Sequence, residues 1–168
     1  MIVTYFKGLR STKPDSNREL SSILEDIRGG KWKSLVEKCR TDISKKNLLP
    51  CFTPTGIFNH RSIKGLEEYN GVICLDIDHV DDPESLKSMC KSIPWVHAAF
   101  ITPSGAGLKV IVKTRATVEN YKETEETVQA AFRDETNFVR DNRCKDIARI
   151  QFVSHDPGLY YNPDSSTF

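Results

Sequence analysis

The chain has 168 residues, of which 38% are hydrophobic and 28% charged, and its formal net charge is +1. That length suffices for one domain with a substantial core. No apolar run approaches the ~20 residues of a membrane-spanning helix, and Lys7 interrupts the N-terminal stretch too early for a signal peptide. These features exclude a membrane-spanning protein and favour a globular domain in the cytoplasm, expected to span residues 1–168 as a single unit.

The cysteines and the charge distribution narrow this further. The five cysteines (39, 51, 74, 90 and 144) are an odd number without a CxxC pair, which favours buried free thiols in a reducing compartment over disulfides or zinc. Residues 1–50 carry 11 Lys and Arg against 6 Asp and Glu, whereas residues 51–168 carry 13 against 17. A basic arm beside an acidic core suits a protein that binds phosphates while holding a cation, although scattered solvated lysines would give the same count.

The first third of the chain predicts a strand and two helices. Residues 2–6 alternate weakly and read as a strand. Apolar residues at helical spacing from Leu20 to Ile27 predict a helix that follows Ser16–Asn17 and stops at Gly29–Gly30. The same spacing from Trp32 to Ile43 predicts a second helix. Residues 48–58 are expected to be extended, with a turn at Pro54–Gly56.

The remaining pattern predicts strands interrupted by helices. An apolar strand at Val72–Asp78 is followed by Asp82–Pro83, an N-cap and first-turn proline, and by a short helix through Cys90. Residues 96–113 predict an antiparallel hairpin, residues 118–134 an amphipathic helix, and residues 148–154 the last strand. This order lacks the alternation of a doubly wound fold and predicts an α+β domain, with helices over one face of a largely antiparallel sheet.

Two acids at the end of the apolar strand are the first candidate site. Asp76 and Asp78 alternate onto one face, with Cα atoms roughly 6.5–7 Å apart, and that face is expected to be open at this end. No cation near them in the sequence pairs with them. Both carboxylates can therefore reach one divalent ion or a pair of ions, and oxygen ligands suit Mg²⁺ or Mn²⁺. A solvated strand end would look the same.

The hairpin loop and the last strand add candidates. Residues 102–109 read TPSGAGLK, in which Ser104, Gly105 and Gly107 allow backbone N–H groups to face an anion while Lys109 adds a charge; an ordinary glycine-rich hairpin is the plain alternative. Before and along the last strand stand further candidates, namely Asp141, Asp146, Arg149 and His155. Either acid could complete a carboxylate cluster, and the arginine could bind a phosphate or carboxylate with two hydrogen bonds. The histidine reads as a structural hydrogen-bonding residue rather than a general base.

Three segments in this order, ICLDIDHVD, TPSGAGLKVIV and CKDIARIQFVSHDP, resemble the primase–polymerase-like N-terminal domain found ahead of VirE-type and other helicase modules in mobile elements. The resemblance runs from about Leu49 to Pro163. It implies membership of the archaeo-eukaryotic primases, whose core is an RRM-like sheet beside an N-terminal α/β unit. Here residues 51–168 would be the catalytic core and residues 1–50 the basic α/β arm.

The resemblance also assigns roles. Asp76 and Asp78 match a first motif that binds metal, and Gly107 to Lys109 match a second motif that holds the incoming nucleotide's phosphates, with lysine where the wider superfamily has histidine. A third motif supplies another metal-binding acid and then a phosphate-contacting arginine, Arg149. Asp141 has the family's spacing to that arginine and is preferred as the third acid, whereas Asp146 lies nearer the strand and stays open as the alternative.

The resulting hypothesis is a template-directed nucleotidyltransferase that uses two divalent metal ions, Mg²⁺ or Mn²⁺, in replication of a mobile element. Nucleoside triphosphates and a single-stranded DNA template would be its ligands. A helicase module in cis or trans would be its partner, and the chain would be part of a longer protein. Two alternatives stay open: a catalytically silent nucleic-acid-binding module of the same fold, and a phosphohydrolase with Asp76 as nucleophile in a DxD motif. The latter would require a parallel, doubly wound sheet.

Overall fold

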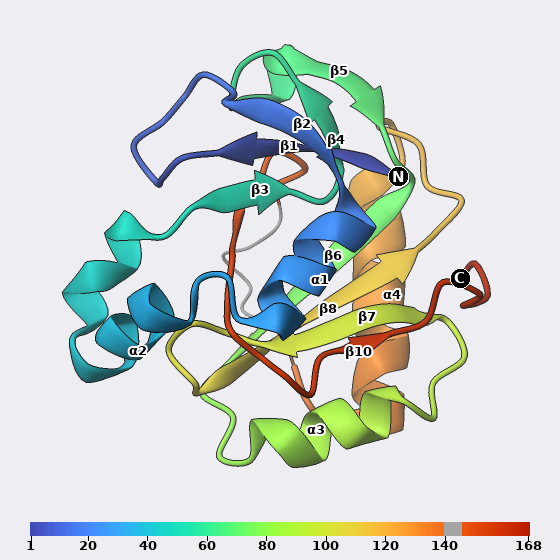
Figure 1. Cartoon of the computed structure of the whole chain (residues 1–168). Coiled ribbons are helices and arrows are strands. Elements are labelled where there is room, and N and C mark those ends of the chain that lie inside the picture. Colours follow the sequence, from blue (N-terminus) through green and yellow to red (C-terminus); the bar gives the residue numbers. More distant parts are fainter. Residues whose placement is uncertain (140–145) are drawn as a thin grey trace.

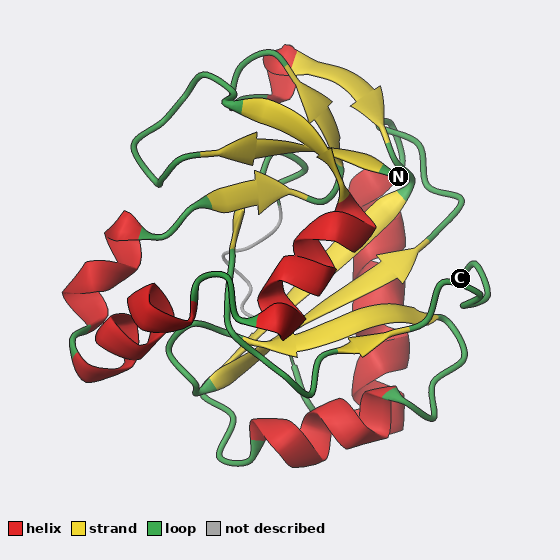
Figure 2. Cartoon of the chain, in the orientation of Figure 1, coloured by secondary structure: helices red, strands yellow, loops and turns green. Residues whose placement is uncertain are grey.

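The computed structural model describes residues 1–139 and 146–168 and has the predicted α+β organisation (Figures 1 and 2). Every strand pairing among the described residues is antiparallel. No helix in this part of the chain is both long and apolar enough to cross a membrane. Candidate Asp141 and Cys144 lie outside the described residues.

The first sheet is built mostly from the N-terminal third of the chain. Its four strands lie in the order β2–β1–β3–β9, and their bounds are Ile2–Phe6 (β1), Ser16–Glu19 (β2), Cys51–Thr53 (β3) and Gln151–Phe152 (β9). A small ribbon beside it pairs Gly56–Phe58 (β4) with Leu66–Tyr69 (β5). The helical segments of this part are Leu20–Gly29 (α1), Lys33–Thr41 (α2) and the 3₁₀ turns Ile43–Leu48 (η1) and Ile63–Gly65 (η2).

The second sheet has the order β10–β7–β8–β6. Its strands are Val72–Asp78 (β6), Val96–Ile101 (β7), Gly107–Lys113 (β8) and Tyr160–Tyr161 (β10), and its helices are Pro83–Cys90 (α3) and Tyr121–Thr136 (α4). Strand β8 therefore lies between β6 and β7, so that β6–α3–β7–β8–α4 forms the split βαββα arrangement. The turn-rich tail supplies β10 at the edge, beside β7.

Local signals set two helix ends as expected, although the residues just after Ser16–Asn17 belong to β2 rather than to α1, and α2 ends at Thr41 rather than at Ile43. Helix α1 stops where Gly30 adopts a left-handed conformation, with φ of 80°, which glycine reaches without a steric penalty. Helix α3 begins where the Asp82 side chain accepts a hydrogen bond from the Ser85 N–H and Pro83 occupies the first turn.

Both faces of the second sheet are covered over most of their length. Helices α3 and α4 pack on one face, through residues such as Leu86 and Phe132 against Leu75. On the other face α1 covers Cys74 and its neighbours (Figure 1). The expectation of an open face beside the two acids is therefore wrong for Asp76, which is only 7% exposed.

The last strand also differs from its prediction. Residues 148–154 were expected to form the last strand of one largely antiparallel sheet, but the structure has two such sheets, and only Gln151–Phe152 form a strand, which pairs with β3 in the first of them. The alternation of buried and exposed residues correctly indicates an extended segment. It carries no information about which edge the segment joins, since both sheets offer apolar edges.

The described cysteines are free and buried, as expected; they are Cys39, Cys51, Cys74 and Cys90. Burial raises the pKa of the Cys51 thiol to about 11 and that of Cys90 to about 12. Thiols held protonated in this way are poor nucleophiles and poor metal ligands. These two cysteines therefore serve as small core residues.

Candidate functional site

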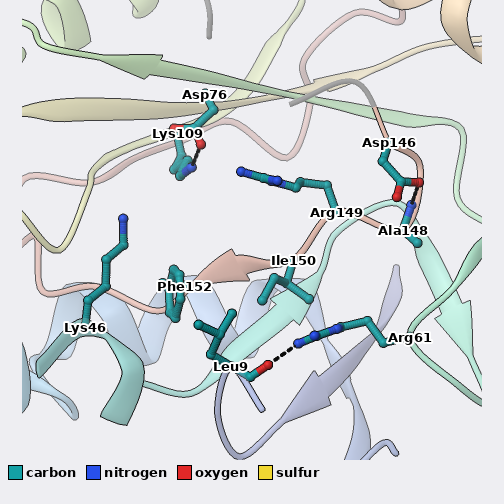
Figure 3. Close-up of a pocket in the computed structure, with 10 residues that line it drawn as sticks. All are labelled: Leu9, Lys46, Arg61, Asp76, Lys109, Asp146, Ala148, Arg149, Ile150 and Phe152. Carbon is teal, nitrogen blue, oxygen red and sulfur yellow. Dashed lines mark hydrogen bonds and ion pairs between the residues drawn. The ribbon is translucent and has the colours of Figure 1, made fainter. Parts of the chain in front are cut away.

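A cavity of about 320 Å³ opens between the two sheets (Figure 3). It brings together segments from β6, β8 and the chain before β9 with the N-terminal loop and η1. The described residues that line it are Leu9, Lys46, Arg61, Asp76, Lys109, Asp146, Ala148, Arg149, Ile150 and Phe152. Asp76, Lys109, Asp146 and Arg149, proposed from three separate stretches of sequence, thus share one cavity.

Asp76 and Lys109 form an ion pair across two strands. The register of β6 and β8 places them directly opposite each other, and the Lys109 Nζ contacts the Asp76 Oδ2 (Figure 3). Asp76 and Lys109 are only 7% and 6% exposed, so the pair lies largely out of solvent. The expectation that no cation pairs with the carboxylate is therefore wrong, because antiparallel pairing brings Lys109 from a distant part of the sequence.

Asp78 stands at the open end of the same strand. Strand alternation puts it on the same sheet face as Asp76, but it is exposed and faces Gly107, which has no side chain to pair with it. The two acids therefore have different surroundings. Asp76 is buried and paired, whereas Asp78 is open to solvent.

Arg149 and Lys46 point their charged ends toward the Asp76–Lys109 pair from two sides of the cavity (Figure 3). The Lys46 Nζ lies 5.2 Å from the centre of the Phe152 ring, a cation–π distance. No carboxylate within the described ranges forms an ion pair with either residue. Two positive charges are thus directed into the cavity without a described counterion.

Asp146 and Arg61 line the cavity but are engaged locally. One Asp146 carboxylate oxygen accepts a hydrogen bond of 2.9 Å from the Ala148 N–H, which stabilises a turn. The Arg61 guanidinium donates to the Leu9 carbonyl. Among the described residues, no group of three or more His, Cys, Asp and Glu side chains could hold a metal ion. Asp141, the other candidate third acid, is not described.

The hairpin loop uses its own hydrogen-bonding groups. The Gly105 N–H donates to the Thr102 carbonyl at 2.9 Å, and the Ala106 N–H donates to the Ser104 hydroxyl at 3.4 Å. Gly107 is needed because a Cβ there would come within 2.6 Å of the Ile77 carbonyl oxygen. Of the described residues that line the cavity, none belongs to residues 102–107. Ser104, Gly105 and Gly107 therefore shape a tight hairpin, and Lys109 alone of this motif reaches the cavity.

His155 lies away from the cavity, beside the end of α1. A Cβ on Gly30 would lie 3.2 Å from the His155 Cε1, so the ring packs over that glycine. The His155 carbonyl accepts a hydrogen bond of 3.2 Å from the Arg40 guanidinium. The ring therefore packs as a structural residue, but its buried Nδ1 has no hydrogen-bond partner among the described residues, so the side chain does not show the hydrogen bonding expected of it.

The electrostatics of the cavity favour an anion. Four cationic and two acidic side chains line it, and one acid and one cation compensate each other in the Asp76–Lys109 pair. The remaining charges are mainly positive, and Arg149 has the planar guanidinium that suits phosphate. The volume lies in the range of small-ligand pockets.

Sequence reasoning missed the contributions of the N-terminal unit. Lys46 and Arg61 carry no motif, and Phe152 reads as an ordinary strand residue. The excess of positive charge in residues 1–50 was the one signal that this part of the chain contributes to an anion site. It did not identify Lys46 as the residue involved. Arg61 had no signal, since only the fold brings it beside Leu9.

Comparison with known proteins yields one assignment. No curated protein and no solved structure matches the chain. A family model described as "BT4734-like, N-terminal domain" matches residues 44–161, which include most of η1, both acids of β6, the hairpin and β9. This match covers well over half of the 168 residues. The chain therefore belongs to the family of BT4734-like N-terminal domains.

Proposed function

We propose that this domain catalyses template-directed nucleotidyl transfer, as a primase or primase–polymerase does, in the cavity between the two sheets. One observation carries the proposal. Asp76, Lys109, Asp146 and Arg149 come from three separate segments and line a single cavity. A carboxylate beside several cations suits a substrate that combines a divalent ion with phosphates.

In this proposal the cationic side chains bind the triphosphate. Arg149 and Lys46 already point into the cavity (Figure 3) and would hold the β- and γ-phosphates, which leave as pyrophosphate. The 3′-oxygen of the growing strand forms a bond to the α-phosphorus while the bond to pyrophosphate breaks, and the hydroxyl proton passes to water. Positioning and charge stabilisation account for most of the catalysis in such transfers.

The carboxylates fit a divalent ion that is shared with the substrate. Mg²⁺ is commonly held by one or two carboxylates together with substrate phosphates and water. Asp76 and Asp78 would therefore suffice as the protein's ligands to the ion, without a third carboxylate. The bound ion would supply charge stabilisation at the reacting phosphate. Lys109 would then contact Asp76 less closely and face the phosphates instead. Mg²⁺ and Mn²⁺ both suit these oxygen ligands.

The wider setting belongs to the same proposal. We place the domain in replication of a mobile element in the cytoplasm, with a single-stranded DNA template and a helicase module in cis or in trans. The resemblance of the three sequence segments to primase–polymerase-like domains supports this setting.

A silent nucleic-acid-binding module is the second candidate, and one observation favours it. Lys109 pairs with Asp76, the acid on which metal chemistry would depend. The phosphohydrolase alternative receives less support, because Asp76 lies on a strand whose described pairing is antiparallel, whereas that function required a parallel, doubly wound sheet.

Primer extension on a DNA template with Mn²⁺ or Mg²⁺ tests the proposal. We expect the wild type to add nucleotides and Asp76→Asn to lose at least about 100-fold of that activity, a usual cost of removing a group that stabilises transition-state charge. Asp134→Asn, which changes an exposed acid on α4, should retain activity. Extension that survives Asp76→Asn would refute the site. Binding of the DNA template without any extension would favour the silent module.

A further inference from the structure

The end of α2 and the following η1 carry a concentration of positive charge, which we call the basic ridge (residues 38–48). Its cations are Lys38, Arg40, Lys45 and Lys46, and its single acid is Asp42. One Asp42 carboxylate oxygen accepts hydrogen bonds from the Ser44 N–H at 3.0 Å and the Ser44 hydroxyl at 2.7 Å, and the other lies 3.7 Å from the Lys45 Nζ in an exposed ion pair. Eleven residues thus carry a net charge of +3 in a chain whose total is +1.

Two of these cations place the ridge on the rim of the cavity. Lys46 lines the cavity and contacts the Phe152 ring. Arg40 lies against the hairpin tip, where a Cβ on Gly105 would be 3.5 Å from its Nε. Between them, burial raises the pKa of the Cys39 thiol, and the positive charges of Lys46 and Arg40 partly oppose that rise. Both charges therefore lie near Cys39, with Lys46 in the cavity wall and Arg40 beside the hairpin tip.

The ridge also exposes apolar side chains. Ile43 and Leu48 are 60% and 61% exposed, and they are among the few large hydrophobic residues that reach solvent in the described part of the chain. Both belong to η1, which also carries Lys45 and Lys46. Cations beside exposed apolar groups suit a single-stranded nucleic acid, because its phosphates are charged and its bases are accessible. A 3₁₀ turn of this length offers little to a lipid surface, which favours long amphipathic helices.

We propose that the basic ridge binds single-stranded nucleic acid and directs it toward the cavity. Lys38, Arg40 and Lys45 contact phosphates, while Ile43 and Leu48 contact bases. That the ridge guides the nucleic acid into the cavity rests on the proposed nucleotidyl transfer. That the ridge binds single-stranded nucleic acid does not depend on it. Because charge dominates and the apolar contacts are aliphatic, binding tolerates many sequences and weakens steeply with salt.

Fluorescence anisotropy of a labelled single strand of about 20 nucleotides, well above the site size of one small binding module, tests this without nucleotide or metal. Comparing a DNA strand with an RNA strand of the same sequence shows which nucleic acid the ridge binds more tightly. The triple variant Lys38→Gln, Arg40→Gln, Lys45→Gln should weaken binding at least tenfold. The slope of the logarithm of the binding constant against the logarithm of the salt concentration should become shallower by about 2. Each phosphate of a single strand that loses its cationic partner reduces the slope by about 0.7, and the variant removes three such partners.

A matched triple variant removes the same charge elsewhere. Lys91→Gln, Arg115→Gln, Arg133→Gln changes three exposed cations outside the ridge and should bind nearly as the wild type does. Equal losses in both triple variants, or equal binding of a duplex or of anionic vesicles, would overturn the proposal. If the ridge triple variant has a lowered melting temperature, the double variant Lys38→Gln, Lys45→Gln replaces it, because it keeps the Arg40 hydrogen bond to His155. The salt-dependence slope of the double variant should change by about two thirds as much as expected for the triple variant. Strand binding without primer extension would support the ridge and count against the enzyme.

Discussion

The contact between Asp76 and Lys109 joins two residues that the sequence assigns to different tasks. The acid is expected to bind metal and the lysine to bind phosphate, yet antiparallel register sets them side by side. Buried opposite charges compensate each other's desolvation, and losing one partner leaves the other charge uncompensated. Each member of the pair therefore compensates the buried charge of the other while no ligand is present.

This pairing gives Lys109→Ala two opposite effects. Nucleoside triphosphate should bind about 10-fold more weakly, since the variant lacks a charge-assisted hydrogen bond worth at least about 1.4 kcal/mol. Mn²⁺ alone should bind several-fold more tightly, because Asp76 no longer has a competing cation. Titration calorimetry measures both affinities, with Lys91→Ala as the control for an exposed lysine. Weaker Mn²⁺ binding, or unchanged triphosphate binding, would contradict the account.

At the scale of single residues, the sequence correctly predicted which charged residues of β6, β8 and the segment before β9 line the cavity. It erred on how the residues interact. Asp76 was expected to be open and unpaired, because its partner is distant in sequence. Gly105 and Gly107 were interpreted as a phosphate cradle, whereas the turn and the close approach to Ile77 account for both glycines. The plain hairpin, weighed as the alternative, describes the loop better.

At the scale of elements, a second buried ion pair fastens the segment after β9 to the second sheet. The Lys87 ammonium on α3 lies 2.7 and 2.8 Å from the two carboxylate oxygens of Asp156. The same carboxylate accepts hydrogen bonds from the N–H groups of Ile101 and Gly158. This well-satisfied network joins α3, β7 and the C-terminal segment, and it holds the chain that connects to Arg149 in place.

Removing the ammonium should therefore be costly. Lys87→Ala leaves a buried carboxylate without its cation and should lower the free energy of unfolding by about 3–5 kcal/mol. Lys91→Ala, on the exposed end of the same helix, should change it by less than about 0.5 kcal/mol. Urea unfolding followed by circular dichroism compares the two. A loss below about 1 kcal/mol for Lys87→Ala would show that the network contributes little.

The elements themselves were largely predictable, because their signals are local. Helical spacing and Gly30 located α1, and Asp82 with Pro83 located the start of α3. The partner of the last strand was not predictable. Residues 151–152 are nearly 100 positions from β3 along the chain, and period-two alternation indicates a strand without naming its neighbour.

At the scale of the whole molecule, the charge asymmetry of the sequence has a spatial counterpart. The basic N-terminal part supplies Lys46 to one wall of the cavity and the basic ridge to its rim, while the second sheet supplies Asp76 and Lys109 to the other wall. No local pattern predicts a cavity between two sheets, so Arg61 and Phe152 became visible only in the fold.

A crystal structure of the protein with Mn²⁺ and a non-hydrolysable nucleoside triphosphate tests the central claim most directly. The account predicts anomalous Mn²⁺ density at Asp76, with the triphosphate oxygens against Arg149 and Lys46 and with Lys109 turned toward the phosphates. The same density would show whether Asp78, Asp146 or Asp141 completes the coordination. A triphosphate bound elsewhere, or Mn²⁺ bound away from Asp76 while Lys109 keeps its present position, would contradict the account.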